Sequence, residues 1–433
     1  MRKKFMNNKN FDKQFYSNLF DKLFPINRSI MGEGYRKSLL ILNKYINLKL
    51  IKFRSGKKIF DWTIPHEWKI NEAYILTPDN KKICDFKKNN LFVLNYSDKI
   101  NKKLSLFELK KILNSNKALP DAIPYTFSYY KKKVGFNISY NEKKKLKKGF
   151  YRVIIDSKFK KGDLVIGEKI LKGKSNKDFL ISSYLCHPSM ANNELSGPLI
   201  LLGLYQRIQN WNERKYNYRF VINPETIGSL SYLYKYKKNI KKKLVAGLVL
   251  TCLGGPNKKI SIKKPKNELA DLNKFIDLFS QKKIIKSRNY DPIVGSDERQ
   301  YCSPGFNLPV GQAAKTIYRN YKEYHTSLDN KNFLKIENIK KTVDELEYFL
   351  KFFDRLNGKI KRKNKFGEVF LHKYDLYKNK NTNNLTKTII HILSCGENQN
   401  ELIDLIIQKK LSLKNVIEAI DILEKKKIIT IKK

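Results

Sequence analysis

The sequence predicts an α/β fold, because short apolar runs rich in β-branched residues alternate with stretches of helical periodicity from about residue 150 onward. The runs that indicate strands are residues 151–155, 179–185, 218–222 and 244–251. Helical spacing occurs between them, at residues 197–207 and 227–236. Strands that alternate with helices in this way are typical of a layered α/β domain.

A separate β-rich module is predicted for residues 61–149. Aromatic residues, turn residues and short alternating runs replace the long helical signals there. We therefore assign residues 1–60 and 150–358 to the α/β domain, on either side of the module. A lysine-rich break at residues 359–365 ends that domain.

Residues 370–433 are predicted to form a winged helix-turn-helix domain. Three segments carry apolar residues at helical spacing, Ser412 is placed as the N-cap of the third, and the chain ends in a β-like run. Winged helices often bind DNA, but the fold also serves protein contacts. The third helix has mixed charge and no arginine, the commonest specific reader of guanine. A protein contact or dimerisation is therefore favoured, with DNA binding as the alternative.

The composition indicates a globular chain of two or three domains. Of 433 residues, 41% are hydrophobic and 12% aromatic, so a sizeable core is expected. Lysine and arginine number 89 against 40 acidic residues, which gives a net charge of +49. The excess is almost all lysine and is spread along the whole chain. Charge alone therefore does not establish a nucleic-acid binder.

No segment has the pattern of a membrane span or a secretory signal. The chain lacks an apolar run of 18 residues, and its basic amino terminus precedes no apolar stretch of signal-peptide length. A cytoplasmic location is the resulting expectation. The five cysteines are widely spaced without a C-x-x-C pair, so neither a disulfide framework nor a cysteine zinc site is predicted.

Two of the five histidines, His187 and His325, are candidate metal ligands. His187 follows the predicted strand 179–185, and a polar segment that contains Asn193 leads from it into a helix. His325 lies in a loop after the predicted strand 310–316. Open α/β sheets bind ligands at the carboxyl ends of their strands. Two imidazoles alone do not define a zinc site, which needs about three protein ligands.

Two further polar segments supply acidic groups. Glu225 follows the predicted strand 218–222, where a carboxylate beside a metal could take a proton from bound water. Asp297 lies in a polar stretch between two apolar runs and is predicted as a metal ligand or as the partner of one. Its neighbours Glu298 and Arg299 could hold a substrate terminus.

Five motifs occur in a fixed order: His-Pro at 187–188, Ala-Asn-Asn-Glu-Leu-Ser-Gly at 191–197, Pro-Glu-Thr-Ile-Gly-Ser at 224–229, Gly-Ser-Asp-Glu at 295–298 and Tyr-His-Thr-Ser at 324–327. The ordered set resembles the co-catalytic zinc aminopeptidase superfamily, which includes bacterial leucyl aminopeptidases. More closely, the chain resembles bacterial aminopeptidase-like domain proteins found among polysaccharide-biosynthesis genes. This resemblance covers nearly the whole chain. It implies a three-layer α/β domain with an inserted β-rich domain and a carboxyl-terminal winged helix.

The resemblance also implies roles for single residues. His187 matches the first zinc-ligand histidine, His325 the last, and Glu225 the general base. Three acidic ligands of the family are replaced here, by Asn193, Thr226 and Thr251. These replacements disfavour a two-zinc centre, because a neutral amide or hydroxyl oxygen does not offset the charge of the dication.

Two functions follow from this reading. The first is an aminopeptidase-like zinc metallohydrolase that cleaves a terminal amide or peptide bond of a small peptide-like or N-acylated substrate, linked to surface-polysaccharide biosynthesis. Its single zinc ion would be held by His187, Asn193, His325 and Asp297. Its substrate would be held by Glu298, Arg299 and Tyr324. The alternative is a catalytically degenerate ligand-binding protein that regulates DNA or a protein partner through its winged helix. A homo-oligomer is compatible with either.

Overall fold

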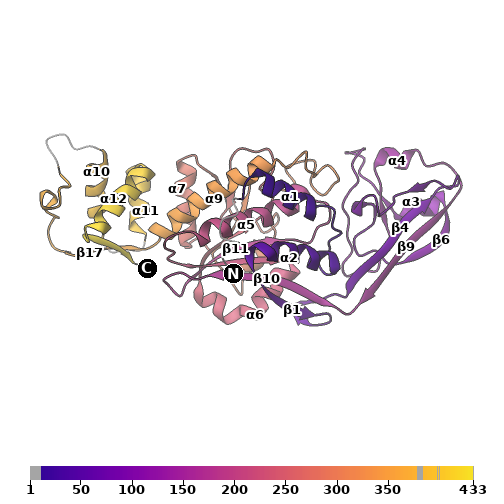
Figure 1. Ribbon diagram of the computed structural model, residues 1–433, viewed down its shortest axis with the longest axis horizontal. Helices are drawn as coiled ribbons and strands as arrows, with labels where there is room; N and C mark the ends of the chain where they lie inside the picture. Colours follow the sequence, from indigo (N-terminus) through magenta and orange to yellow (C-terminus); the bar gives the residue numbers. More distant parts are fainter. Residues whose placement is uncertain (1–10, 378–383, 397, 399, 433) are drawn as a thin grey trace, which may run out of the picture.

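An eight-stranded mixed sheet forms the centre of the molecule (Figure 1). The computed structural model describes residues 11–377, 384–396, 398 and 400–432. Across the sheet the strands are β1 (Lys49–Arg54), β10 (Asp163–Leu171), β12 (Asn217–Asn223), β11 (Asp178–Tyr184), β13 (Leu244–Leu250), β16 (Val310–Ala314), β14 (Ser261–Lys263) and β15 (Lys286–Arg288). The predicted α/β fold is confirmed.

The middle of this sheet is parallel and covered on both faces. β11 pairs in parallel with β12 and β13, and β13 with β16. All of β11 is buried, which explains its continuous apolar run in the sequence. One face is covered by α1 (Lys13–Leu23), α2 (Glu33–Ile46), α5 (Ser196–Gln209) and α9 (Ile336–Leu356), while α6 (Ile227–Lys243) lies on the other (Figure 1). Two further helices complete the layers, α7 (Asp271–Gln281) and α8 (Glu298–Tyr301).

A second, antiparallel sheet extends from one end of the first (Figure 1). Its strand order is β5 (Lys82–Ile83), β4 (Glu67–Leu76), β9 (Phe150–Lys160) and β6 (Ile100–Ser105). The run 151–155 was expected in the alternating α/β region, but it belongs to β9 and pairs with β4 and β6. A hydrophobic pattern identifies a strand without identifying the sheet that it joins.

Short elements surround this second sheet. They are β2 (Lys58–Ile59), β3 (Trp62–Thr63), the 3-10 turn η1 (Asn90–Phe92), α3 (Leu106–Ile112), β7 (Leu113–Asn114), β8 (Phe136–Asn137) and α4 (Tyr140–Lys144). β2 and β3 form a hairpin whose residues bear on the candidate site described below.

The opposite end of the molecule carries the last helices (Figure 1). These are α10 (Asn384–Leu393), α11 (Glu401–Gln408) and α12 (Leu413–Lys425), with β17 (Lys359–Arg362) paired to β18 (Ile429–Lys432) and a 3-10 turn η3 (Leu371–Tyr374). Arg355 of α9 forms ion pairs of 2.6 Å with both Asp421 and Glu424 of α12. α12 is thus attached to the α/β layers. Ser412 occupies the predicted N-cap position, but its side chain makes no capping hydrogen bond.

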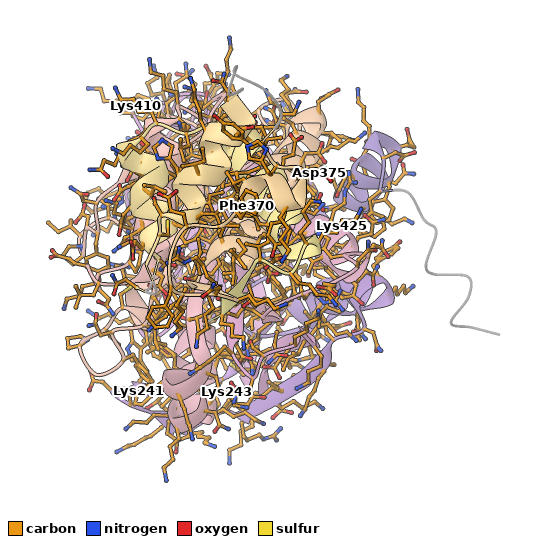
Figure 2. All side chains as sticks on the ribbon, turned by 90° about the vertical axis from the view of Figure 1, so that its left-hand side faces the viewer. Lys241, Lys243, Phe370, Asp375, Lys410 and Lys425 are labelled. Atoms are coloured by element: carbon orange, nitrogen blue, oxygen red, sulfur yellow. The ribbon has the colours of Figure 1, made fainter. Side chains whose placement is uncertain are left out.

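Basic side chains project from this end over a wide area (Figure 2). Lys410 and Lys425 lie near the terminal helices, and Lys241 and Lys243 belong to α6, on the central domain. The positive charge is thus distributed rather than gathered on one helix face.

The expectations about membrane spans and about cysteines can both be compared with the structure. Within the described ranges, no helix is long and apolar enough to cross a membrane. All five cysteines are buried free thiols, as predicted.

Candidate active site

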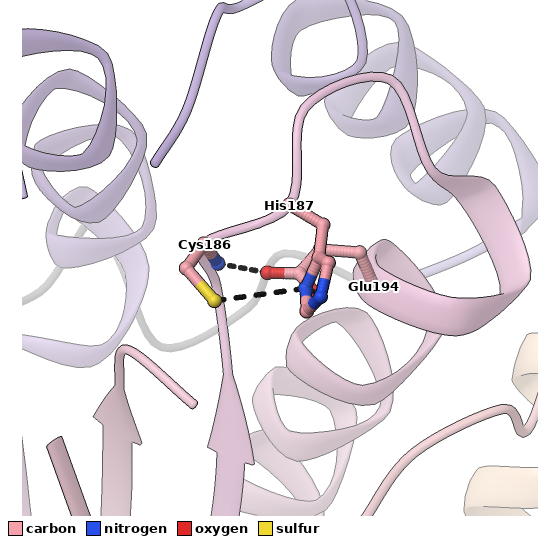
Figure 3. A group of neighbouring side chains, drawn as sticks. All are labelled: Cys186, His187 and Glu194. Carbon is pink, nitrogen blue, oxygen red and sulfur yellow. Dashed lines mark hydrogen bonds and ion pairs between the residues drawn. The ribbon is translucent and has the colours of Figure 1, made fainter. Parts of the chain in front are cut away.

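His187 lies just beyond the carboxyl end of β11 and is held by Glu194. The Nδ1 atom of His187 lies 2.5 Å from Oε2 of Glu194, whose other oxygen accepts a hydrogen bond from the backbone N–H of Cys186 (Figure 3). The backbone carbonyl of His187 accepts a 3.0 Å hydrogen bond from the buried Arg28. Because Nδ1 is engaged, Nε2 is the atom that His187 presents to a ligand.

Glu194 also changes the basicity of this imidazole. Burial by itself lowers the pKa of His187, but Cys186 and Glu194 raise it by more, so that it lies well above its ordinary value. A carboxylate that binds the far nitrogen of a metal-binding histidine fixes the ring orientation and makes the ring a stronger ligand. Glu194 is therefore suited to position His187.

Glu225 follows β12 and faces the same space. Its Oε2 lies 3.6 Å from Nε2 of His187, and its Oε1 accepts a 2.6 Å hydrogen bond from Ser296 Oγ. Its side chain is 27% exposed, so it can reach a ligand. Burial raises the pKa of Glu225, and the charge of His187 and the Ser296 hydrogen bond act in the opposite direction. A carboxylate with a raised pKa is a better proton acceptor near neutral pH.

His325 enters from a loop that is fixed by the β-rich part of the chain. The backbone N–H of Tyr125 donates to the carbonyl of His325 at 2.8 Å, and that of Ser327 to Ile123 at 2.9 Å. His325 adopts a left-handed backbone with φ +54°, which these bonds hold in place. Tyr324 stacks on the ring at 3.9 Å between centroids. The ring centroids of His187 and His325 lie 5.2 Å apart.

The Nε2 atom of His325 is buried and has no hydrogen-bond partner among the described residues. Burial, followed by the charges of His187 and Arg319, holds the pKa of His325 well below its ordinary value. The imidazole is thus neutral at pH 7, which is the form that binds metals. A buried nitrogen of this kind needs an explanation, and a ligand is one.

Asn193 presents a second buried atom of this kind. Its backbone N–H donates to Asp329 at 2.9 Å and its Nδ2 to the hydroxyl of Tyr184 at 3.2 Å. Its Oδ1 is buried without a partner in the described part of the chain. The hydroxyl of Thr251 bonds to the Tyr184 hydroxyl and to the carbonyl of Asn193.

Asp297 turns toward the backbone behind Glu225. Its oxygens accept hydrogen bonds from Thr226 N–H at 2.6 Å, Ser229 Oγ at 3.1 Å and Asn223 Nδ2 at 2.8 Å. Burial, followed by the charge of Glu225, raises the pKa of Asp297 to about 7. Its carboxylate shapes the strand-end loop in which Thr226 has φ +63°.

Glu298 and Arg299 also lie away from the histidines. Glu298 is fully buried, pairs with Lys263 at 2.5 Å and accepts a 3.1 Å hydrogen bond from Gln312. Arg299 donates to the carbonyl of Pro292 at 3.3 Å. The oxygens of Glu298 are thus occupied by protein groups. The structure brings His187, Glu225 and His325 together and places this pair in a neighbouring cluster.

Three contributors were not predicted from the sequence: Glu194, Ser296 and Tyr125. Tyr125 packs edge-on against both imidazoles, with its ring centroid 5.1 Å from that of His187 and 5.2 Å from that of His325. Glu194 could have been found from its place next to Asn193. Tyr125 carries no local signal of its role, because its contacts come from distant segments.

The chain is similar to known proteins in sequence and in fold. Residues 17–356 match the family described as Domain of unknown function (DUF4910). A Clostridium acetobutylicum protein, named as a candidate polysaccharide biosynthesis protein with an aminopeptidase-like domain, is 40% identical over 319 residues, 72% of this chain and 71% of that protein. A crystal structure of a candidate peptidase from the same organism has a TM-score of 0.88 and 32% identity, and the match covers 99% of both chains.

More distant structures share the fold. The zinc aminopeptidase of Bacillus subtilis matches with a TM-score of 0.56 and 13% identity, over 79% of this chain and 94% of that one. The M28 peptidase precursor of Shewanella amazonensis matches with a TM-score of 0.52 and 13% identity, over 78% and 91%. The predicted aminopeptidase-like fold is thereby confirmed. The chain belongs to the DUF4910 family and has an aminopeptidase-like α/β fold.

Proposed function

We propose that this protein is a hydrolase with a single zinc ion that cleaves a terminal amide bond of a small substrate. The observation that carries the proposal is the buried Nε2 of His325, which has no partner among the described residues. It lies near the oriented imidazole of His187 and the carboxylate of Glu225, at the edge of the sheet where β11 and β12 end. Buried polar atoms without partners are rare unless they serve a ligand or strain. The names of the aminopeptidase-like relatives support the same reaction class.

The donor set fits one metal ion. Two imidazole nitrogens and the Oδ1 of Asn193 would give three ligands, the number that catalytic zinc sites use before a water or substrate joins. His187, whose pKa is raised, would release a proton when the ion binds. When bound by His187, His325 and Asn193, zinc would polarise the amide carbonyl and lower the pKa of water. A neutral oxygen at Asn193 leaves the bound ion with more positive charge than an aspartate would.

The residues of this chain supply the proton transfer. Glu225 takes the proton from the attacking water and returns it to the leaving nitrogen. Ser296 holds Oε1 of Glu225, which directs Oε2 toward the histidines. Asp297 fixes the backbone of Thr226, so the loop that carries Glu225 keeps its position.

Several finer assignments belong to the same proposal. We propose residues 61–149 as an inserted module, whose segment 123–125 bonds to the loop that carries His325. The name of the Clostridium acetobutylicum relative supports a substrate from polysaccharide biosynthesis. We propose residues 370–433 as a winged-helix module that makes protein contacts, since α12 already contacts another part of this chain through the ion pairs of Asp421 and Glu424 with Arg355.

The exchange Glu225→Gln tests the assignment. It keeps the size of the side chain and removes the base, so turnover of an amide substrate should fall about 10²- to 10⁴-fold. Zinc content, measured by elemental analysis, should stay unchanged. The matched control Glu323→Gln changes a glutamate of the His325 loop and should keep full activity. Equal activity of the Glu225→Gln and wild-type proteins would overturn the role of Glu225.

A further inference from the structure

A small cavity of about 150 Å³ opens beside His187 and Glu225. Its other lining residues are Ile30, Trp62, Phe127, Tyr129, Tyr130, Cys186, Thr226 and Ile227. Binding pockets for whole small molecules usually measure about 300 to 1,000 Å³. This cavity therefore suits an end group of a substrate rather than the entire molecule.

Aromatic rings from the β-rich part of the chain form one wall. Phe127 and Tyr129 stack at 4.8 Å, and Trp62 meets Tyr130 edge-on at 5.8 Å. The hydroxyl of Tyr129 bonds to that of Tyr125 at 2.9 Å, and the hydroxyl of Tyr130 donates to the carbonyl of Thr63 at 3.1 Å. Since protein groups engage both hydroxyls, the wall offers mainly apolar ring surface to a ligand.

The polar groups of the cavity leave little to bind a substrate cation. Among the described residues that line it, Glu225 alone carries a carboxylate; its Oε1 accepts from Ser296 and its Oε2 serves as the proposed base. The transfer of an ammonium from water to this aromatic wall without a free carboxylate partner is costly, and cation–π contacts of about 0.5 to 2 kcal/mol offset only part of that cost.

We propose that this cavity binds the neutral acyl group of an N-acylated amine, and that the free ammonium end of a peptide is disfavoured there. The assignment rests on the proposed hydrolase function and specifies its substrate class. In the reaction, the oxygen of water bonds to the acyl carbon and the C–N bond breaks. Glu225 passes the proton from water to the departing nitrogen, so the products are a carboxylate and an amine. Trp62 and Tyr130 select the acyl group.

The test is a binding titration with two matched probes, N-acetyl-L-phenylalaninamide and L-phenylalaninamide, at a pH where the second is protonated. Calorimetry measures the affinity of the zinc-loaded wild-type protein, which keeps the Glu225 carboxylate, for each probe, and chromatography checks that the probe stays intact during the titration. The acetylated probe should bind at least tenfold more tightly. Trp62→Ala, followed by calorimetry, should weaken its binding about tenfold. The matched control Phe107→Ala, which alters an aromatic side chain on α3 that is 71% exposed, should leave binding unchanged.

Equal or tighter binding of the protonated amine would overturn the proposal and indicate a cation-binding aromatic cage. Unchanged affinity in Trp62→Ala would also overturn it. The hydrolase proposal fails separately: selective binding of the acetylated probe with no turnover by the wild-type protein would refute hydrolysis and keep the cavity assignment. Faster hydrolysis of the free-amine substrate would support the hydrolase and refute the acyl specificity.

Discussion

Two neighbouring groups of polar residues differ in how their hydrogen bonds are used. The histidine cluster comprises His187, Asn193, Glu225 and His325, and two of its buried atoms have no partner among the described residues. The aspartate cluster comprises Asp297 and Glu298, whose carboxylate oxygens all accept from protein groups or pair with Lys263. Ser296 bridges the two by bonding to Glu225. The histidine cluster thus keeps buried atoms that a ligand could bind, whereas protein groups satisfy the carboxylates of the aspartate cluster.

The largest effect in this comparison is expected from Glu194→Gln, which weakens the support of His187. The neutral amide no longer raises the basicity of the imidazole, so zinc affinity should fall about 10- to 100-fold, as measured by competition with a chelator. The control Glu168→Gln makes the same exchange at a buried glutamate that pairs with Arg219. Its zinc affinity should match the wild type. An equal loss in both proteins would show a general effect of buried charge.

A smaller effect is expected from Ser296→Ala, which removes the hydrogen bond between the clusters. Glu225 loses its fixed orientation, so kcat should fall about tenfold, the equivalent of about 1.4 kcal/mol. Zinc affinity should not change. Ser303→Ala is the matched control, because Ser303 Oγ bonds only to the nearby carbonyl of Gln300 among the described residues. If Ser296→Ala alters zinc affinity instead of kcat, Ser296 supports metal binding, and its proposed role in orienting Glu225 is wrong.

The exchange Asp297→Asn should affect stability rather than metal binding. It disturbs buried hydrogen bonds, so the free energy of unfolding should fall by about 1 to 3 kcal/mol in a urea titration. Loss of zinc from this variant would show that Asp297 contributes to the metal site.

The same variant has a pH signature. Burial raises the pKa of Asp297 from 3.8 to about 7, so the protonated form is favoured in the folded protein. Its contribution to stability is fully present below pH 3.8 and is lost as the pH rises through 7. The stability of Asp297→Asn should lack this contribution, which would show as a smaller decline between about pH 4 and 7. Identical pH profiles would contradict the raised pKa.

Much of the framework could be predicted because it depends on local patterns. The apolar runs in the sequence predict the buried strands β11, β12 and β13, and His187 and Glu225 follow two of these strands. Strand ends in a parallel sheet meet at one edge, so the sequence indicated that these side chains converge.

The orientation of side chains could not be predicted in the same way. Asp297 and Glu298 have the composition of a site, yet their partners come from Asn223 and from Lys263 on β14, far away in the sequence. The position of His325 likewise depends on a segment about 200 residues earlier, at Tyr125. Sequence spacing does not encode such long-range contacts.

The most direct test of the account is the zinc content of three purified proteins: the wild type, His325→Ala and Asp297→Asn. The account predicts about one zinc ion per chain in the wild type and in Asp297→Asn, and none in His325→Ala. Circular dichroism should show that all three are folded. A wild-type protein that binds no zinc, or zinc that is kept by His325→Ala and lost by Asp297→Asn, would contradict it.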